Sequence, residues 1–184
     1  MRYAQIRKMD ISNGKGIGVS LFVQGCDFHC KGCFNTETWN FEQGKNFTNE
    51  TINTILDLCS PEYITHLSVL GGEPFHSNNY DSVMQLCHAF KQKHPYKTVW
   101  VWTGYNLDEL LQSYQFKHDI QKRLQCIDYI IAGRFIKDLY YPDLLFRGSL
   151  NQRIYKRISD NNISSEQYIT FRDDTNKFDL SITK

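Results

Sequence analysis

Short apolar runs of strand length alternate with longer amphipathic stretches between about residues 19 and 132. This alternation is typical of βαβ units on a parallel sheet, whose strands are buried on both faces. The predicted strands are Val19–Val23, His66–Leu70, Thr98–Trp102 and Ile127–Ala132. The predicted helices are Asn49–Cys59, Asn79–His94, Leu107–Tyr114 and Lys117–Gln125.

The first predicted helix has a start signal as well as a buried stripe. Thr48 is placed to cap its N-terminus, and Thr51 takes the position where a capping box more often has Glu or Gln. The apolar positions that recur at helical spacing are Ile52, Ile55, Leu56 and Cys59. We therefore expect this helix to pack one face against a sheet.

The alternation fades after about Gly148, and residues 159–184 are mostly polar. One weak strand, Gln167–Phe171, is the only element that the pattern predicts there. Because no repeat or Pro/Gly-rich linker divides the chain, residues 1–184 are interpreted as one domain. Residues 159–184 form a polar C-terminal extension whose role the sequence does not indicate.

Each predicted strand is followed directly by a loop rich in Gly, Cys, Glu or Arg. In parallel α/β folds the loops after the carboxyl ends of the strands open on one face, where ligands bind. We therefore expect these loops to converge on one mouth: Gln24–Asn35, Gly71–Pro74, Thr103–Tyr105 and Gly133–Arg134.

Composition and charge narrow the function classes. A chain of 184 residues can bury roughly 70% of its unfolded surface in one domain. Lys and Arg number 21 against 20 carboxylates, for a net charge of +1. This balance argues against a nucleic-acid partner bound mainly through its phosphates.

The first residues lack the apolar core of a signal peptide, and the longest apolar runs are far shorter than the about 20 residues that span a bilayer. We therefore expect a soluble cytoplasmic protein without a membrane partner. In that compartment the six cysteines are reduced thiols or metal ligands rather than disulfides.

Cys26, Cys30 and Cys33 follow the first predicted strand with the spacing C-x-x-x-C-x-x-C. Soft thiolates select iron–sulfur clusters, and three of them can hold three corners of a 4Fe–4S cubane. The fourth iron is then open to a ligand. An α-amino and α-carboxylate pair, as in S-adenosylmethionine, would chelate it.

Two other interpretations would also account for these cysteines. A structural zinc site needs four ligands, so Cys59 or Cys126 would have to join the loop from a distance. A closed cluster that only carries electrons is the other non-enzymatic alternative. Cys59, Cys87 and Cys126 themselves lie on predicted core faces or beside a strand, and we expect them to pack in the core.

The loop Cys26–Cys33 resembles the cluster motif of radical S-adenosylmethionine enzymes. Gly32-Cys33-Phe34-Asn35 is similar to one branch of them, the activating enzymes of anaerobic ribonucleoside-triphosphate reductase. The resemblance spans about Met1 to Arg153. It continues through the blocks Asp10–Gly16, Gly71–Pro74, Val101–Tyr105, Gly133–Phe135 and Arg147–Gln152.

The resemblance implies an α/β fold, an incomplete open (βα) barrel. It implies that Cys26, Cys30 and Cys33 bind a 4Fe–4S cluster and that S-adenosylmethionine is the second cofactor. One electron from a reduced flavodoxin-type or similar donor would cleave S-adenosylmethionine, and the resulting radical would take hydrogen from a glycine of the large catalytic subunit of the reductase. No side-chain catalyst beyond cluster and cofactor is implied. The implied cofactor-binding residues are Phe28, Gly32, Cys33, Phe34, Gly71, Gly72, Glu73 and Arg134.

The chain departs from the superfamily at Gly32, where many members have an aromatic residue that contacts adenine. Either Phe28 or Phe34 is left to take that role. Arg134 is a candidate partner for the carboxylate or ribose of the ligand, and Arg147–Arg153 for contact with a partner protein. Rival activities are a pyruvate formate-lyase type activase and a small-molecule radical enzyme such as a carboxy-deazaguanine synthase.

Overall fold

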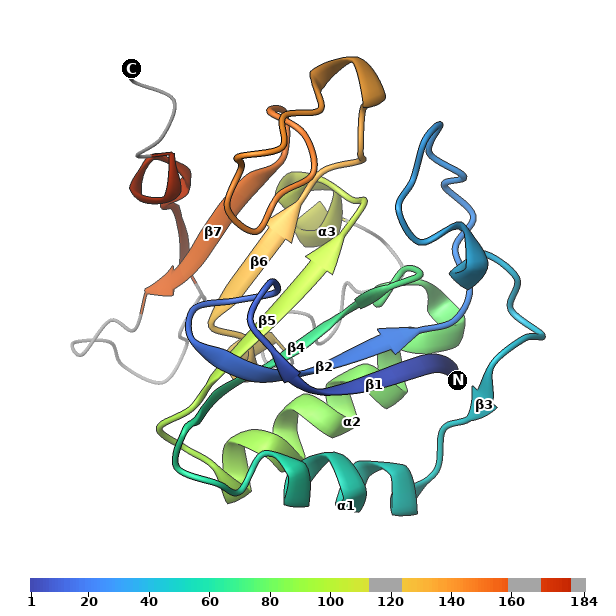
Figure 1. Cartoon of the computed structure of the whole chain (residues 1–184), viewed down its shortest axis with the longest axis vertical. Helices are drawn as coiled ribbons and strands as arrows, with labels where there is room; N and C mark the ends of the chain where they lie inside the picture. The colour runs from blue at the N-terminus through green and yellow to red at the C-terminus, as the bar shows by residue number, and fades with distance from the viewer. Residues whose placement is uncertain (113–123, 159–169, 180–184) are drawn as a thin grey trace.

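The computed structural model describes residues 1–112, 124–158 and 170–179. Within them the strands form one eight-stranded sheet in the order β3-β1-β2-β4-β5-β6-β7-β8 (Figure 1). The strands are β1 Arg2–Asp10, β2 Ile17–Val23, β3 Lys45–Asn46, β4 Ile64–Gly71, β5 Thr98–Thr103, β6 Tyr129–Ala132, β7 Arg153–Ile158 and β8 Thr170–Asp173.

The helices are α1 Asn49–Leu58, α2 Ser77–Lys93 and α3 Leu107–Gln112, and four short 3-10 turns complete the described elements. These turns are η1 Thr36–Thr38, η3 Leu124–Cys126, η4 Lys137–Leu139 and η5 Thr175–Phe178. No helix in the described ranges combines the length and apolarity needed to cross a bilayer.

The centre of the sheet is parallel and its flanks are antiparallel. β2, β4, β5 and β6 run parallel to one another, whereas β1 pairs antiparallel with β2 and β7 pairs antiparallel with β6. β3 and β8 lie at opposite edges. The fold is thus a mixed α/β sheet that does not close on itself.

The two faces of the sheet bury different side chains. Val19, Leu67 and Val99 belong to the main core, together with the apolar stripes of α1 and α2. Figure 1 shows both helices on the same side of the sheet. Residues one position further along, such as Trp100, belong to a second small cluster with Ile131 and Ile154, as expected from the two-residue period of a strand. Most of the buried apolar residues belong to the cluster on the helix side.

The start signal of α1 is confirmed. The backbone N–H of Thr51 donates to Thr48 Oγ1 at 3.4 Å, and the backbone N–H of Thr48 donates to Thr51 Oγ1 at 3.2 Å. These reciprocal bonds form a capping box with Thr in the place of Glu. The predicted apolar stripe of this helix is buried.

The four predicted strands correspond to β2, β4, β5 and β6, with ends shifted by a few residues. The predicted helix Asn79–His94 starts two residues earlier, where the His76 side chain accepts from the N–H of Asn78 and caps α2. Most of the predicted helix Lys117–Gln125 lies outside the described residues. Its last part was wrong, because Leu124–Cys126 forms a 3-10 turn.

Four strands were missed or only partly predicted. β1 and β7 have half-buried, charge-rich sequences, RYAQIRKMD and RIYKRI, whose pattern is not clearly that of a strand. β3 has only two residues. The weak predicted strand Gln167–Phe171 overlaps β8, although its first residues lie outside the described ranges. β1 and β7 pair with the predicted strands β2 and β6, and β3 and β8 then pair with β1 and β7 at the two edges.

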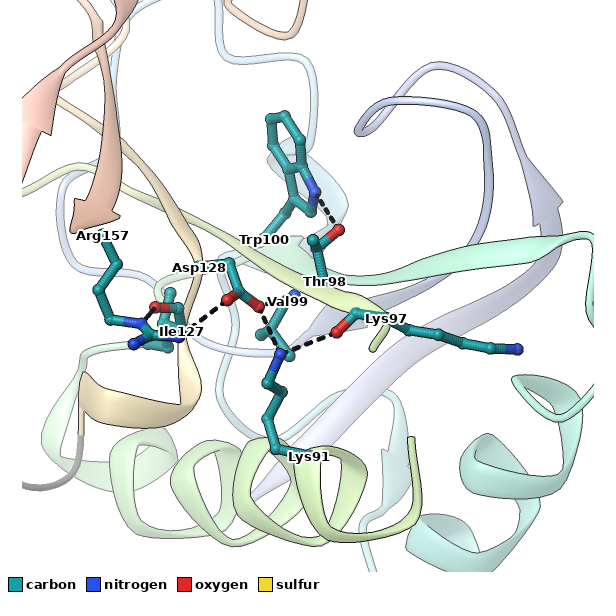
Figure 2. A network of polar contacts seen from close by, with 8 residues as sticks. All are labelled: Lys91, Lys97, Thr98, Val99, Trp100, Ile127, Asp128 and Arg157. Carbon is teal, nitrogen blue, oxygen red and sulfur yellow. Dashed lines mark hydrogen bonds and ion pairs between the residues drawn. The ribbon is translucent and has the colours of Figure 1, made fainter. Parts of the chain in front are cut away.

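Asp128 joins α2, β5 and β7 at the amino ends of the parallel strands (Figure 2). Its carboxylate accepts from Lys91 Nζ at 3.0 Å, from a guanidinium nitrogen of Arg157 at 3.0 Å and from the Val99 N–H at 2.8 Å. Lys91 also donates to the carbonyl of Lys97 at 2.9 Å. Two cations therefore compensate one carboxylate at the end of the sheet far from the loop Gln24–Asn35, which we call the cysteine loop.

Candidate active site

A cavity of about 480 Å³ opens on the face of the sheet away from α1 and α2. Each of the four loops that were expected to converge contributes to its lining, through Cys26, Gly72, Gly104 and Gly133. The prediction of a shared mouth at the carboxyl ends of the parallel strands is therefore confirmed. The loop between β1 and β2 adds Asn13 to the same wall.

Cys26, Cys30 and Cys33 all line this cavity, and all three are free thiols of intermediate burial. The loop is held by backbone bonds, from Cys26 N–H to Trp39 O at 3.0 Å and from Cys33 N–H to Cys30 O at 3.0 Å. Burial raises the pKa of Cys26 to about 11 and also raises the pKa of Cys30. Deprotonated thiols here would need a positive partner.

The three cysteines fit an iron–sulfur cluster, because three soft sulfur atoms line one cavity. The irons of a bound cluster would supply the positive charge that stabilises the deprotonated thiols. In the ranges that the structure describes, no group of three or more His, Cys, Asp or Glu side chains is arranged to hold a single metal ion. Cys59, Cys87 and Cys126 are buried away from the cavity lining, and their expected role in core packing is confirmed.

Two buried amides hold the cysteine loop, and sequence reasoning missed both. Gln24 Nε2 donates to the carbonyls of Glu37 at 2.9 Å and Asn40 at 2.8 Å. Asn79 Nδ2, at the start of α2, donates to the carbonyls of Gln24 and Glu73, each at 3.0 Å. A polar Gln directly after an apolar strand was the only signal available. The amides fix the cysteine loop against the Gly71–Pro74 loop.

Glu73 is 2% exposed and joins two of the converging loops. Its carboxylate accepts from Thr103 Oγ1 at 2.8 Å, from the Gly104 N–H at 2.8 Å and from the Phe75 N–H at 2.9 Å. Burial raises the pKa of Glu73 to about 7. The side chain thus braces the loop after β4 against the loop after β5, while Gly71, Gly72 and Glu73 itself line the cavity.

Phe28 is enclosed by other residues of the site. The Arg134 guanidinium carbon lies 4.5 Å from the centre of the Phe28 ring, and the Tyr105 ring meets it edge-on at 4.8 Å. A Cβ atom added to Gly104 would come within 2.3 Å of the Phe28 ring, so only glycine permits this approach. The predicted site residues Phe28 and Arg134 therefore contact each other, with a cation over an aromatic face.

Gly32 and Phe34 are the other two positions considered for contact with adenine. The backbone of Gly32 has φ +78°, in the left-handed region, so an aromatic residue there would be strained. Phe34 lines the cavity and is 63% exposed, with ring centres of Phe135 and Tyr140 at 5.0 and 5.6 Å. Of the two phenylalanines, Phe34 has the more accessible ring.

The far wall of the cavity is held by the C-terminal segment. Arg147 is 7% exposed, donates to the Gln152 carbonyl at 3.0 Å and forms an ion pair with Asp179. Phe178 packs edge-on against Phe146 at 5.5 Å between ring centres. Within the segment Arg147–Arg153, which was expected to contact a partner protein, the Arg147 side chain is turned into the molecule, whereas Leu150 and Arg153 are exposed.

Residues 12–155 match the family model of a 4Fe-4S single cluster domain. The chain is also similar to curated proteins named anaerobic ribonucleoside-triphosphate reductase-activating protein. It is 39% identical to the one of Vibrio cholerae over 158 residues, which is 85% of this chain and 98% of that protein. It is 36% identical to those of Escherichia coli K12, over 84% of this chain and 98% of that protein, and of phage T4, over 84% and 94%.

Proposed function

The chain belongs to the family of anaerobic ribonucleoside-triphosphate reductase-activating proteins, and we propose that it generates a glycyl radical on that reductase. It would do so by reductive cleavage of S-adenosylmethionine at a 4Fe–4S cluster. The observation that carries this proposal is the lining of one cavity by three free cysteines and by the glycine-rich loops of three further strands.

Cys26, Cys30 and Cys33 would hold three irons and leave the fourth for S-adenosylmethionine. A cluster held there would supply the electron for reductive cleavage of S-adenosylmethionine, which is the source of the radical chemistry at the target glycine. The chain itself positions the reacting atoms and excludes quenching groups, which is the protein's part in cofactor chemistry. The anchored cysteine loop suits that task.

Glu73 places beside the cavity a carboxyl group with a pKa of about 7, and a cationic ligand would favour its charged form. S-adenosylmethionine carries a sulfonium and an ammonium group, and the three neutral donors on Glu73 leave its charge without a cation within the described residues. The backbone of Gly71 and Gly72 would lie close to the ammonium group. Phe34, with its accessible ring, is the aromatic residue that we assign to adenine. Phe28 lines the cavity beside it and is held by the guanidinium of the exposed Arg134, which is not part of the lining.

The open sheet supports the interpretation as an incomplete barrel whose mouth admits a segment of a partner protein. We propose a reduced flavodoxin-type protein of the cytoplasm as the electron donor. The rivals are a pyruvate formate-lyase type activase, a small-molecule radical enzyme, an electron carrier and a zinc module. The similarity to reductase-activating proteins along nearly their whole length favours the first proposal.

The test is to reconstitute the protein anaerobically with iron and sulfide and to mix it with the large reductase subunit, S-adenosylmethionine and dithionite. We expect the EPR signal of a glycyl radical on the reductase, dependent on S-adenosylmethionine. Cleavage of S-adenosylmethionine without a radical on the reductase, together with a radical on pyruvate formate-lyase, would favour the rival activase. A colourless reconstituted protein would favour zinc.

A further inference from the structure

Large apolar side chains gather on the outside of the molecule beside the cavity. Eleven large hydrophobic residues are exposed in the described ranges, and seven of them belong to the cysteine loop or to the segment between β6 and β7. We call these seven the apolar rim: Phe34, Ile136, Leu139, Tyr140, Tyr141, Leu145 and Leu150. Scattered apolar residues are ordinary on a surface, but such a concentration marks an interaction site.

Several members of the rim are joined to one another. The ring centres of Phe34 and Tyr140 lie 5.6 Å apart, although they come from different loops. The Leu150 N–H donates to the Leu139 carbonyl at 2.9 Å, beside an antiparallel bridge between Tyr140 and Ser149. In Figure 1 the segment between β6 and β7 rises beyond the carboxyl ends of the strands, on the same side as the cysteine loop.

Polar contacts beneath the rim hold it in shape. Ser149 Oγ accepts from the Ile136 N–H at 3.2 Å, and Gln152 Oε1 accepts from the Gly148 N–H at 2.8 Å. Trp102 Nε1 donates to the Phe146 carbonyl at 2.7 Å, which ties the segment to β5. The outward position of the apolar side chains is therefore built into the segment, and a partner would meet a preformed surface.

The rim is continuous with the cavity. Phe34 belongs to both, and Phe135, Leu144 and Gly148 line the cavity from the segment that carries the rest of the rim. A ligand small enough to enter the cavity alone would leave most of the rim uncovered. A glycine within a folded protein reaches the cavity only if the residues around it cover the mouth.

We propose that the apolar rim is the docking surface for the part of the reductase that carries the target glycine. This inference rests on the proposed function. The exposed tyrosine, isoleucine and leucine side chains would pack against apolar residues of the partner, as in the centres of protein interfaces. The rim would thereby place the glycine above the cavity and keep water out during hydrogen transfer.

The test uses the reconstituted protein with the double substitution Leu145→Ser and Leu150→Ser, neither of which lines the cavity. The matched control is Tyr63→Ser with Tyr96→Ser, which are 57% and 99% exposed and precede β4 and β5 at the opposite end of the sheet. Two rates are measured: cleavage of S-adenosylmethionine without reductase, and glycyl-radical formation against reductase concentration.

We expect the rim variant to cleave S-adenosylmethionine at the wild-type rate but to need at least about tenfold more reductase for half-maximal radical formation. The control variant should match the wild type in both. A rim variant with unchanged half-saturation would overturn the inference and leave the proposed function intact. A wild-type protein that cleaves S-adenosylmethionine but forms no radical on the reductase would overturn both.

A second copy of the chain is the alternative partner for the apolar rim. Sedimentation of the wild type and the rim variant separates the two cases. We expect both proteins to sediment alike. A wild-type dimer that the rim substitutions convert to monomers would show that the rim is a self-association surface, and would overturn the assignment to the reductase.

Discussion

Glu73 and Asp128 are carboxylates at opposite ends of the parallel strands, and the protein balances their charges differently. Asp128, just before β6, accepts from Lys91, Arg157 and one backbone N–H. Glu73, just after β4, accepts only from a hydroxyl and two backbone N–H groups. In the described part of the chain Glu73 has no cation at ion-pair distance, although it is the more buried of the two residues.

The difference separates a structural site from a ligand site. A buried carboxylate is costly unless cations or hydrogen bonds compensate it. At Asp128 the compensation is complete within the protein, and the result is a link between α2, β5 and β7. At Glu73 burial raises the pKa of the carboxyl group to about 7, and a cationic ligand in the adjacent cavity would stabilise the charged form. The predictions below test that distinction.

The largest effect is expected at the cysteines that line the cavity, at the same end of the sheet as Glu73. Cys30→Ala should abolish the brown chromophore after anaerobic reconstitution and all cleavage of S-adenosylmethionine, because two thiolates cannot hold the open cluster. Cys87→Ala, in the core, is the control and should keep both while losing about 1 kcal/mol of stability. Retained cleavage in Cys30→Ala would contradict the assignment of the ligands.

Glu73→Gln should be the next most severe change. Both carboxylate oxygens of Glu73 accept hydrogen bonds. Glutamine would remove the charge and replace one of these oxygens with an NH₂ group, so one buried backbone N–H would lose its acceptor. We expect at least tenfold weaker binding of S-adenosylmethionine and about 2 kcal/mol lower stability, measured by calorimetry and urea unfolding. The same substitution at the exposed Glu62 should change neither, and wild-type affinity in Glu73→Gln would remove Glu73 from the ligand site.

Asp128→Asn should lower the free energy of unfolding by about 2 kcal/mol, because it leaves two partly buried cations without their counter-charge. Cleavage of S-adenosylmethionine by the folded protein should be unchanged. Asp57→Asn breaks an exposed pair with Lys93 and should cost less than about 1 kcal/mol. Equal losses in the two variants, measured by urea unfolding, would show that the Asp128 network is not the stronger link.

The smallest effect concerns His66, which is buried on the cavity side of β4 near the turn between β1 and β2. Burial lowers the pKa of His66, so the unfolded chain binds the proton more tightly than the folded one. Stability should therefore fall as the pH drops below about 6.5. In His66→Gln the fall should be shallower than in the wild type, and urea unfolding at several pH values compares the two proteins.

The same contrast explains how much of the molecule could be predicted from its sequence. The parallel strands and the cysteine loop could be, because continuous apolar runs and a fixed cysteine spacing are local signals. β1 and β7 could not, because their charged sequences become strands only by pairing with β2 and β6. β8 and η5 lie beyond residue 155, where the match to the family model ends, so the resemblance to the family did not predict them either.

The partners within the site were equally hidden in the sequence. The glycine-rich loop after β4 indicated a ligand site, but two of the three donors that hold Glu73 come from residues 30 and 31 positions later. Two phenylalanines were candidates for adenine, and only the fold places Arg134 and Gly104 against Phe28. Contacts that depend on how loops from different strands meet require the three-dimensional structure.

The most direct test of the central claim is the yield of 5′-deoxyadenosine from the anaerobically reconstituted, reduced protein after S-adenosylmethionine is added. The account predicts 5′-deoxyadenosine and methionine in equal amounts, along with a change in the EPR signal of the reduced cluster. A fully loaded 4Fe–4S cluster that leaves S-adenosylmethionine intact and keeps its EPR signal unchanged would contradict it.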